Sequence, residues 1–414
     1  MSRILRLPAV TLTTRHSPVA YPWQRCQTVP DRGVPIGINS LAAGQLFRYD
    51  PWVCYATGAV TSPNMVLAGQ LGRGKSALVK TYLHRQLALG RQAYVLDPKG
   101  EYAPLAAADG LSRIALRPGG TERLNPLDPA PDATSREQIV TSRTGVIAAL
   151  AGTGLGRPLT GEEHSAVAAA VRPLHERTAT LGEVTTALLH PSPAMAAEVS
   201  TTPDALATAL RPVALELHRL LSGDLAGMID GPTTVRPDPH GPGVVVDLSK
   251  VTSTHAQAAV MVCAGAWLAA AIDVETDRRR LLLVDEAWAL LARGATTGWL
   301  QRTSKLARAR GVQLITVVHR LSDLAAQADA GSATRAQAEG LLADADTRVI
   351  YGQASGEKHL ARTLLGLTDP EADEVCTLRS YRGLWKVGEH TAVVDHVLTC
   401  AEHPLVDTDT RMRA

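Results

Sequence analysis

Short apolar runs, separated by polar and turn-forming residues, recur along most of the chain. Runs with the length of buried strands occupy residues 65–69, 92–97, 113–117, 244–247, 281–284, 312–319 and 347–352. Helix-like spacing of apolar residues follows most of these runs, at residues 75–89, 254–272, 297–310, 320–344 and 355–366. Strands that alternate with helices are typical of a mostly parallel sheet covered on both faces, so the pattern predicts an α/β fold.

The middle of the chain departs from this alternation. From residue 134 to 240, strand signals vanish, and alanine, leucine and helix-starting Ser or Thr residues dominate. Several of these Ser and Thr residues precede an acidic residue by two or three positions, which is typical of capping boxes at helix starts. We therefore expect an all-helical insertion at 134–240 that divides the α/β core into two parts, 46–133 and 241–414.

The two end regions carry weaker β signals. Residues 1–45 contain five prolines and short β-branched runs, which predict an N-terminal arm or a small β element. Residues 379–397 are rich in strand-forming residues on both sides of Gly388, and this predicts a C-terminal β-hairpin.

Residues 69–76 read GQLGRGKS and lie between a predicted strand and a predicted helix. This is the G-x-x-x-x-G-K-[ST] pattern of a phosphate-binding loop, in the structural context that such a loop requires. Its glycines allow tight bends with inward-pointing amides, Lys75 is expected to reach the β- and γ-phosphates, and Ser76 is expected to ligate Mg²⁺. The alternative is a glycine-rich strand–helix turn with an exposed lysine. The candidate nucleotide-binding residues of this loop are Gly69, Gln70, Leu71, Gly72, Arg73, Gly74, Lys75, Ser76 and Ala77.

The apolar run 281–284 ends in two acidic residues, Asp285 and Glu286. At the tip of a buried strand, Asp285 is expected to hold Mg²⁺, directly or through water, and Glu286 to orient or deprotonate the attacking water. Taken alone, two acids after a strand fit a helix start equally well, because acids suit the helix dipole. Together with the phosphate loop they indicate ATP and Mg²⁺ as cofactors and ATP hydrolysis as the reaction. The helical insertion is then either a separate subdomain or a lid over the nucleotide.

Composition places further bounds on the function. The 414 residues are 45% hydrophobic and 20% charged, so the chain is globular rather than disordered. The net charge of +2 gives no global signal for nucleic acid, although a local basic surface would not show in that sum, and DNA contact stays open. Five scattered cysteines suggest neither a zinc site nor a disulfide framework. No signal peptide is evident, and the apolar stretch 258–272 is too short to span a membrane, which favours a cytoplasmic protein.

Six motifs match one protein family in chain order: GQLGRGKS, YVLDPKGEY, LNPLD, VVVDLS, LLLVDEAWALL and KLARARGVQLITVVHR. Over about residues 33–397 the chain resembles the ATPases of type IV secretion and conjugation machines. They are of the VirB-four or TraC type, in the FtsK/HerA branch of RecA-like P-loop motors. The resemblance implies a RecA-like core, a homo-hexamer and membrane-channel subunits of a type IV secretion or conjugation apparatus as partners. Those partners would hold the protein at the inner face of the cell membrane.

The chain departs from the family pattern in two places. Family members carry a large N-terminal domain, whereas 68 residues precede Gly69 here, so the resemblance implies an ATPase half with a separate N-terminal-half subunit as partner. The strand after the acidic motif ends in Val318-His319, where the family has Thr-Gln. We expect His319 to keep the catalytic role of a γ-phosphate sensor, because an imidazole donates hydrogen bonds to phosphate or water.

Four further candidates lie at strand ends. Asp97, Lys99 and Glu101 belong to the DPKGEY loop at the carboxyl end of a predicted strand, the edge of such sheets where ligands bind. A solvated turn explains DPKG equally well. Gln353 follows the strand at 347–352 and is a further candidate for nucleotide contact.

Two arginines are candidates for catalysis in a neighbouring subunit. Arg308 and Arg310, together with Lys305, form a basic helix end before Gly311. An arginine that reaches into the neighbour's site would stabilise charge on the transferred phosphoryl group. The alternative is a solvated basic helix terminus.

These features favour an ATP-hydrolysing motor that energises conjugative transfer or type IV secretion. A double-stranded DNA translocase of the same branch is the first alternative, although no extension the size of a winged helix follows Cys400. A nucleotide-dependent scaffold without turnover is the second alternative, and the intact Lys75, Ser76, Asp285 and Glu286 argue against it.

Overall fold

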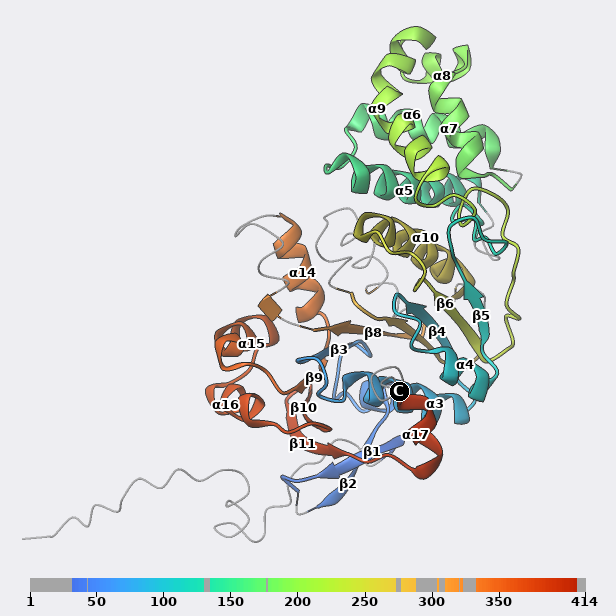
Figure 1. Cartoon of the computed structure of the whole chain (residues 1–414). Coiled ribbons are helices and arrows are strands. Elements are labelled where there is room, and N and C mark those ends of the chain that lie inside the picture. Colours follow the sequence, from blue (N-terminus) through green and yellow to red (C-terminus); the bar gives the residue numbers. More distant parts are fainter. Residues whose placement is uncertain are drawn as a thin grey trace, which may run out of the picture.

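The computed structural model describes residues 32–42, 44–129, 135–175, 178–272, 277–287, 304, 310–319, 321–322 and 333–407. In this part of the chain, 11 strands form one sheet in the order β2-β1-β11-β10-β9-β3-β8-β7-β4-β6-β5 (Figure 1). The strands are β1 (Val34–Asn39), β2 (Gln45–Tyr49), β3 (Met65–Ala68), β4 (Gln92–Asp97), β5 (Ser112–Ala115), β6 (Gly243–Asp247), β7 (Arg280–Val284), β8 (Val312–Val318), β9 (Thr347–Tyr351), β10 (Arg382–Val387) and β11 (His390–His396).

Helices cover this sheet and form the insertion. They are α2 (Pro51–Ala56), α3 (Lys75–Ala88), α4 (Ala103–Asp109), α5 (Arg136–Leu155), α6 (Gly161–Val171), α7 (Leu181–Leu189), α8 (Pro193–Glu198), α9 (Pro203–Ser222), α10 (Thr254–Ile272), α14 (Ala333–Ala343), α15 (Lys358–Leu365), α16 (Asp369–Thr377) and α17 (His403–Val406). The 3₁₀ turns are η1 (Arg172–Leu174), η2 (Ser355–Glu357) and η3 (Cys400–Glu402).

The sheet has a parallel part and an antiparallel part. Neighbouring strands run parallel from β9 to β5. On the other side of β9, the strands β10, β11, β1 and β2 pair antiparallel. The predicted α/β fold with a mostly parallel sheet and a C-terminal hairpin is confirmed. Because carboxyl ends of parallel strands share one edge, the segments that follow β3, β4, β7, β8 and β9 meet there.

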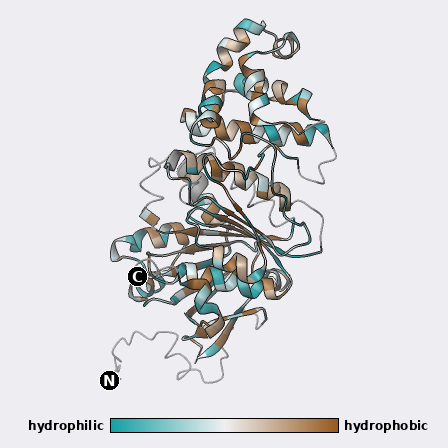
Figure 2. Cartoon of the chain, turned by 45° about the vertical axis from the view of Figure 1, so that its right-hand side comes forward, coloured by the Kyte–Doolittle hydropathy of each residue, from teal (hydrophilic) through white to brown (hydrophobic). Residues whose placement is uncertain are grey.

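Successive side chains of each strand enter different cores. In β3, Val66 and Ala68 join one hydrophobic cluster, and Met65 and Leu67 join the other. The second cluster lies under α3, α4 and α17, and the first lies under α10, α14, α15 and α16. The apolar strands lie between helices whose outer faces are hydrophilic (Figure 2). Burial on both faces explains why the parallel strands read as continuous apolar runs.

The segment between β5 and β6 contains helices and no strand among its described residues. Ser and Thr residues cap these helices, and complete capping boxes join Thr160 to Glu163 and Thr180 to Glu183. Helix α5 packs on α10, and the insertion projects from that side of the sheet, away from α3 (Figure 1). In this arrangement the insertion does not cover the phosphate-loop helix.

The N-terminal β element is a hairpin that extends the main sheet. β1 pairs with β11, more than 350 positions later in the chain, and β2 forms the sheet edge. The helix predicted at 297–310 lies almost wholly outside the described residues, and the one predicted at 320–344 is described as α14 over 333–343. No helix in the described ranges has the length and apolar character needed to cross a membrane.

Candidate active site

The phosphate loop connects β3 to α3 with three glycines in positive-φ conformations. Gly69, Gly72 and Gly74 have φ values of 154°, 72° and 100°. A Cβ on Gly69 would lie 2.6 Å from the Tyr351 Cβ of neighbouring β9, so only glycine fits there. Gly74 is the N-cap of α3 and supplies no side-chain acceptor, which leaves the first-turn amides open to an anion. The loop therefore has the backbone of an anion site.

Lys75 begins α3 and is 4% exposed. Its Nζ donates to the carbonyls of Gly69 and of Gln70, the latter at 2.8 Å. Burial lowers the pKa of Lys75 to about 8, and Lys99 adds to this shift while Asp285 and Glu286 oppose it. An ammonium with a lowered pKa and protein carbonyls as partners is ready to exchange those partners for phosphate oxygens.

Asp285 follows the last residue of β7 and is buried. One carboxylate oxygen accepts the Tyr102 hydroxyl at 3.1 Å, and the other accepts the Glu286 amide at 2.9 Å. Burial raises the pKa of Asp285, and the neighbouring charge of Glu286 raises it further. A bound cation would lower that pKa again, because it favours the ionised carboxylate.

Glu286 has a φ of 53°, which is uncommon for a residue other than glycine. One carboxylate oxygen forms an ion pair with Lys99 and lies 2.5 Å from the Nε2 of His319. Burial alone would raise the pKa of Glu286, but the hydrogen bonds from His319 and Lys99 bring it down to about 2. Lys99 and His319 thus hold the Glu286 carboxylate, which is predicted to act on the attacking water, in its ionised form.

The DPKGEY turn after β4 is organised by Asp97. This fully buried carboxylate accepts the amides of Lys99, Gly100 and Glu101 on one oxygen, at 2.8–3.2 Å, and that of Tyr102 on the other, at 3.0 Å. Burial raises the pKa of Asp97 to about 6. Asp97 fixes the turn that carries Lys99 and Tyr102, and its own side chain is occupied by that task.

Beneath the turn, Lys80 of α3 is fully buried. Its Nζ lies 3.6 Å from the carboxylate of Glu101 and 5.5 Å from the centre of the Tyr102 ring. Burial lowers the pKa of Lys80, and the charges of Glu101, Asp97 and Asp285 oppose that shift. Lys80 therefore balances the negative charge gathered at the carboxyl ends of β4 and β7.

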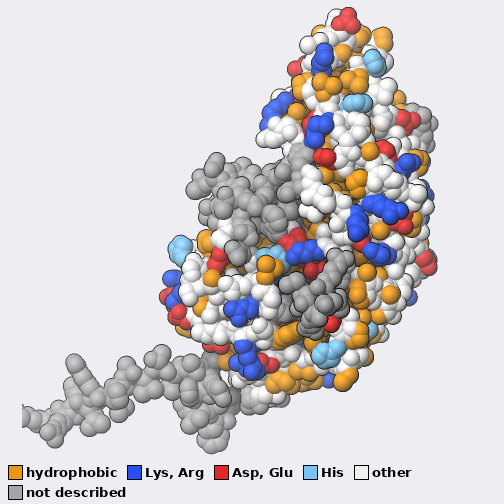
Figure 3. Space-filling view, in the orientation of Figure 1, with side chains coloured by type: hydrophobic (Ala, Val, Ile, Leu, Met, Phe, Trp, Pro, Cys, Tyr) orange, Lys and Arg blue, Asp and Glu red, His pale blue; other side chains and the backbone are white. Residues whose placement is uncertain are grey.

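A cavity of about 560 Å³ is lined by Lys75, Lys99 and Glu101, whereas Asp97, Asp285 and Glu286 are not among its lining residues. On the face drawn in Figure 3, acidic, basic and histidine side chains meet near the middle of the molecule. The lining residues are Leu71, Gly72, Gly74, Lys75, Ser76, Ala77, Lys99, Glu101, His319, Tyr381, His403, Pro404, Val406 and Asp407. The structure thus brings most of the phosphate loop together with Glu101 and His319, as predicted for one site.

The remaining predicted residues lie elsewhere. Gln353 is buried beside the phosphate loop and does not line the cavity; its amide group donates to the Tyr351 carbonyl at 3.3 Å. Arg310 is exposed and precedes the amino end of β8, so the strand separates it from its own site by about 20 Å. Arg308 and Lys305 lie outside the described residues.

The sequence does not predict a role for three residues at this site: Lys80, Tyr102 and Tyr381. Tyr102 stands in the DPKGEY motif beside the candidates Lys99 and Glu101. Lys80 offers one local signal, a lysine inside the apolar run LVKTYL of a helix. Tyr381 offers none, because it lies some 300 positions from the loop that it touches.

The donor set fits a magnesium ion carried by a nucleotide. The Ser76 hydroxyl and the Asp285 carboxylate supply the hard oxygen ligands that Mg²⁺ prefers, and phosphates and water complete such sites. Among the described residues, no group of three or more His, Cys, Asp or Glu side chains could hold a metal ion by itself.

Comparison with solved structures identifies the fold. VirB4 of Thermoanaerobacter pseudethanolicus superposes with a TM-score of 0.74 at 20% sequence identity, covering 91% of this chain and 99% of that one. The plasmid coupling protein TrwB, solved with ADP and Mg²⁺, superposes with a TM-score of 0.60 at 15% identity over 91% of this chain and 94% of its own. TrwB with a non-hydrolysable ATP analogue gives the same TM-score at 16% identity, over 90% and 91% of the two chains.

In comparisons of sequence, no family model and no curated protein matches the chain. The resemblance expected from the motifs is confirmed by structure: the chain has the RecA-like P-loop fold of VirB4 and TrwB across nearly its whole length.

Proposed function

We propose that this protein is a Mg²⁺-dependent ATPase that energises a conjugative transfer or type IV secretion apparatus. One observation carries the proposal: the phosphate loop after β3 and the acidic pair after β7 converge with Lys99 and His319 on one side of the molecule. TrwB was solved in complex with ADP and Mg²⁺ and with a non-hydrolysable ATP analogue, and these complexes support the same ligands for this fold. The transport role rests on the fold shared with VirB4 and TrwB.

In this proposal each residue has a separate task. The amides of residues 69–77 hold the phosphates, and Lys75 pairs with the β- and γ-phosphates. Ser76 and Asp285 would hold a magnesium ion, which would neutralise charge on the phosphates. Glu286 accepts a proton from, or orients, the attacking water, and His319 donates to phosphate or water.

Lys99 and His319 both hold the same oxygen of the Glu286 carboxylate, and that oxygen is not available to water while they do so. The triphosphate offers Lys99 a partner of higher charge, so we infer that Lys99 moves to the terminal phosphate and releases Glu286. In this way, binding of ATP would free the Glu286 carboxylate to act as the base.

ATP affinity and phosphate release, measured together, test the proposed function. Lys75→Ala should weaken ATP binding and abolish turnover, because the buried cation next to the phosphates is lost. Glu286→Gln should keep ATP affinity and lower turnover by about 10²-fold or more, because magnesium ligation is untouched. Lys358→Ala, which removes an exposed lysine paired with Asp373, is the matched control and should behave like the wild type. Normal turnover by Glu286→Gln would remove Glu286 from the mechanism.

A DNA translocase is less well supported. Acidic and basic side chains are interspersed over the visible part of the helical insertion, and the described residues on that face form no basic stripe (Figure 3). The TM-score with the coupling protein TrwB is also lower than that with VirB4.

A further inference from the structure

The lining of the cavity includes a second set of residues that the chemistry above does not use. Lys75, Lys99 and His319 are its charged and imidazole groups, whereas Tyr381, His403, Pro404 and Val406 add ring and apolar surface. Tyr381 immediately precedes β10, and the other three belong to α17, late in the chain. A nucleotide has the same division, with phosphates at one end and a flat base at the other.

Tyr381 is fixed in an unusual conformation against the phosphate loop. Its φ of 62° lies in the left-handed region, which large side chains rarely adopt. Its amide donates to the Arg73 carbonyl at 2.9 Å, and its carbonyl accepts the His396 amide at 2.7 Å. Its ring lies beside Gly74, where a Cβ would approach the Tyr381 Cδ1 to 3.2 Å. The surroundings thus hold a strained residue next to the start of α3.

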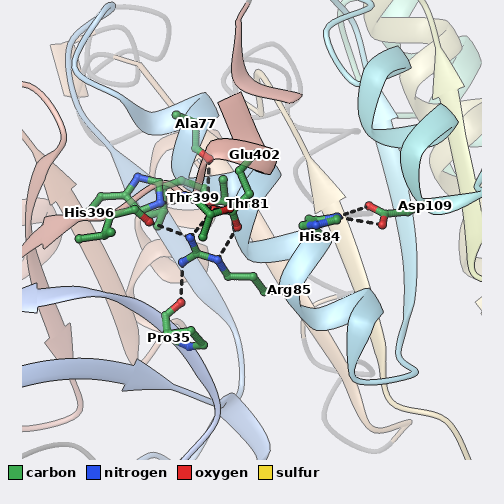
Figure 4. Close-up of polar contacts among 11 residues, drawn as sticks. Pro35, Ala77, Thr81, His84, Arg85, Asp109, His396, Thr399 and Glu402 are labelled. Atoms are coloured by element: carbon green, nitrogen blue, oxygen red, sulfur yellow. Dashed lines mark hydrogen bonds and ion pairs between the residues drawn. The ribbon is translucent and has the colours of Figure 1, made fainter. Parts of the chain in front are cut away.

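The Tyr381 ring stacks on a histidine, and the residue remains partly exposed. It stacks on the His396 ring with centroids 6.4 Å apart and planes 30° apart, yet Tyr381 remains 43% exposed. The Nε2 of His396 lies 2.9 Å from the Thr81 hydroxyl of α3, as Figure 4 shows. Helix α3 therefore fixes the histidine that supports the tyrosine.

Helix α3 also holds α17. Arg85 bonds both oxygens of Glu402, at 2.6 and 2.7 Å, and donates to the carbonyls of Pro35 and Val397 at 2.6 and 2.7 Å (Figure 4). Glu402 immediately precedes α17, so these bonds anchor the helix that brings His403 and Pro404 to the cavity. Tyr381 and α17 are thereby both tied to the phosphate-loop helix.

We propose that Tyr381 is the platform on which the base of the nucleotide stacks, with α17 as the facing wall. The inference rests on the proposed function, because the phosphates must occupy the loop for the base to reach the ring. An aromatic face stacks on any base, so the platform would favour nucleotides over inorganic polyphosphates rather than one base over another.

The experiment compares ATP with inorganic tripolyphosphate, both with Mg²⁺, because the two share the phosphates and only ATP has a base. The wild type should bind ATP more tightly than tripolyphosphate by about tenfold or more. Tyr381→Ala should lose about that factor for ATP and keep its affinity for tripolyphosphate, whereas Tyr381→Phe should keep both affinities. Tyr55→Ala is the matched control, because Tyr55 is equally exposed at 43% and does not line the cavity.

The outcomes separate the two proposals. Equal affinity of the wild type for both ligands overturns the stacking platform whether or not the variants fold. So does a Tyr381→Ala variant that keeps ATP affinity, or one that loses both ligands equally while Tyr381→Phe retains them. If the wild type binds neither ligand, the proposed function fails and the platform fails with it.

Discussion

At the scale of single residues, the cations of the cavity are paired with oxygens of the protein itself. Lys75 donates to two loop carbonyls, and Lys99 forms an ion pair with Glu286. The two ammonium groups also lie close enough for Lys99 to lower the pKa of Lys75. Two convergent cations suit a ligand with several negative charges, and the γ-phosphate is the part that distinguishes ATP from ADP.

Replacement of Lys99 by methionine should therefore act on ATP more than on ADP. If Lys99 moves to the terminal phosphate, Lys99→Met loses a charge-assisted hydrogen bond with ATP alone, which should cost about tenfold in affinity. Dissociation constants of both nucleotides in the presence of Mg²⁺ measure this difference. Lys358→Met is the control, and an equal loss for ATP and ADP would mean that Lys99 only maintains the fold.

The roles of some residues can be predicted from the sequence, whereas the roles of others cannot. The phosphate loop and the Asp285–Glu286 pair could be predicted because each is a local pattern next to a strong strand signal. Asp97 was expected to contact the nucleotide, whereas its carboxylate holds the turn, and no sequence pattern distinguishes those two uses. Lys80 and Tyr381 act through contacts that only the folded chain creates.

At the scale of elements, α3 is the centre of the site. It begins with the phosphate-binding turn, and through Thr81 and Arg85 it holds the segment from β11 to α17. Burial raises the pKa of Glu402, but the bonds from Arg85 and from the Thr399 amide outweigh this effect and bring it to about 2. The ordinary value is 4.5, so folding favours the ionised carboxylate.

Because of the Arg85–Glu402 contact, the stability of the folded chain should decrease as the pH is lowered through a defined window. Because the folded-state pKa of Glu402 is below the unfolded value, its contribution is complete above about pH 4.5 and is lost toward pH 2. The contribution is about 2–3 kcal/mol, and Glu402→Gln should remove its pH dependence. Denaturant unfolding at several pH values between 3 and 6 tests this. The control is Glu389→Gln, an exposed residue of the β10–β11 turn, and parallel pH curves for wild type and Glu402→Gln would contradict the assignment.

Most helices and strands could be predicted from the sequence, but which of them pair or pack against one another in the fold could not. Helix α3 and the strands β3, β4, β7, β8 and β9 follow from periodicity, since strands buried on both faces read as apolar runs. The pairing of β1 with β11 joins distant parts of the chain through backbone hydrogen bonds, which carry no local sequence signal. The packing of α17 against α3 is equally long-range.

At the scale of the whole molecule, the sheet has one edge that carries the site and an opposite edge that carries Arg310. An arginine so far from its own cavity can assist phosphoryl transfer only in a second copy of the chain. Arg308, two positions earlier, stays a candidate for the same role. An assembly of copies, which the resemblance predicts as a hexamer, would make turnover depend on protein concentration.

Mixing two inactive variants tests this role in the neighbouring copy. Arg308→Ala or Arg310→Ala should keep ATP binding and lower turnover by about 10³-fold or more. Mixing either with Lys75→Ala should restore part of the activity, because a mixed contact can pair an intact phosphate loop with an intact arginine. Specific activity that is constant with concentration, together with no recovery on mixing, would exclude both arginines as residues acting in a neighbour.

The position of β3 also has a consequence for synthesis of the chain. This early strand lies between β8 and β9, which the ribosome makes more than 200 residues later, and the wall of α17 follows later still. Nascent chains emerge at about 5–20 residues per second, so the phosphate loop waits roughly ten seconds to one minute for its neighbours. Under the proposed function, ATP would therefore stabilise only chains translated through β9, and the cellular nucleotide pool would favour finished molecules over unfinished ones.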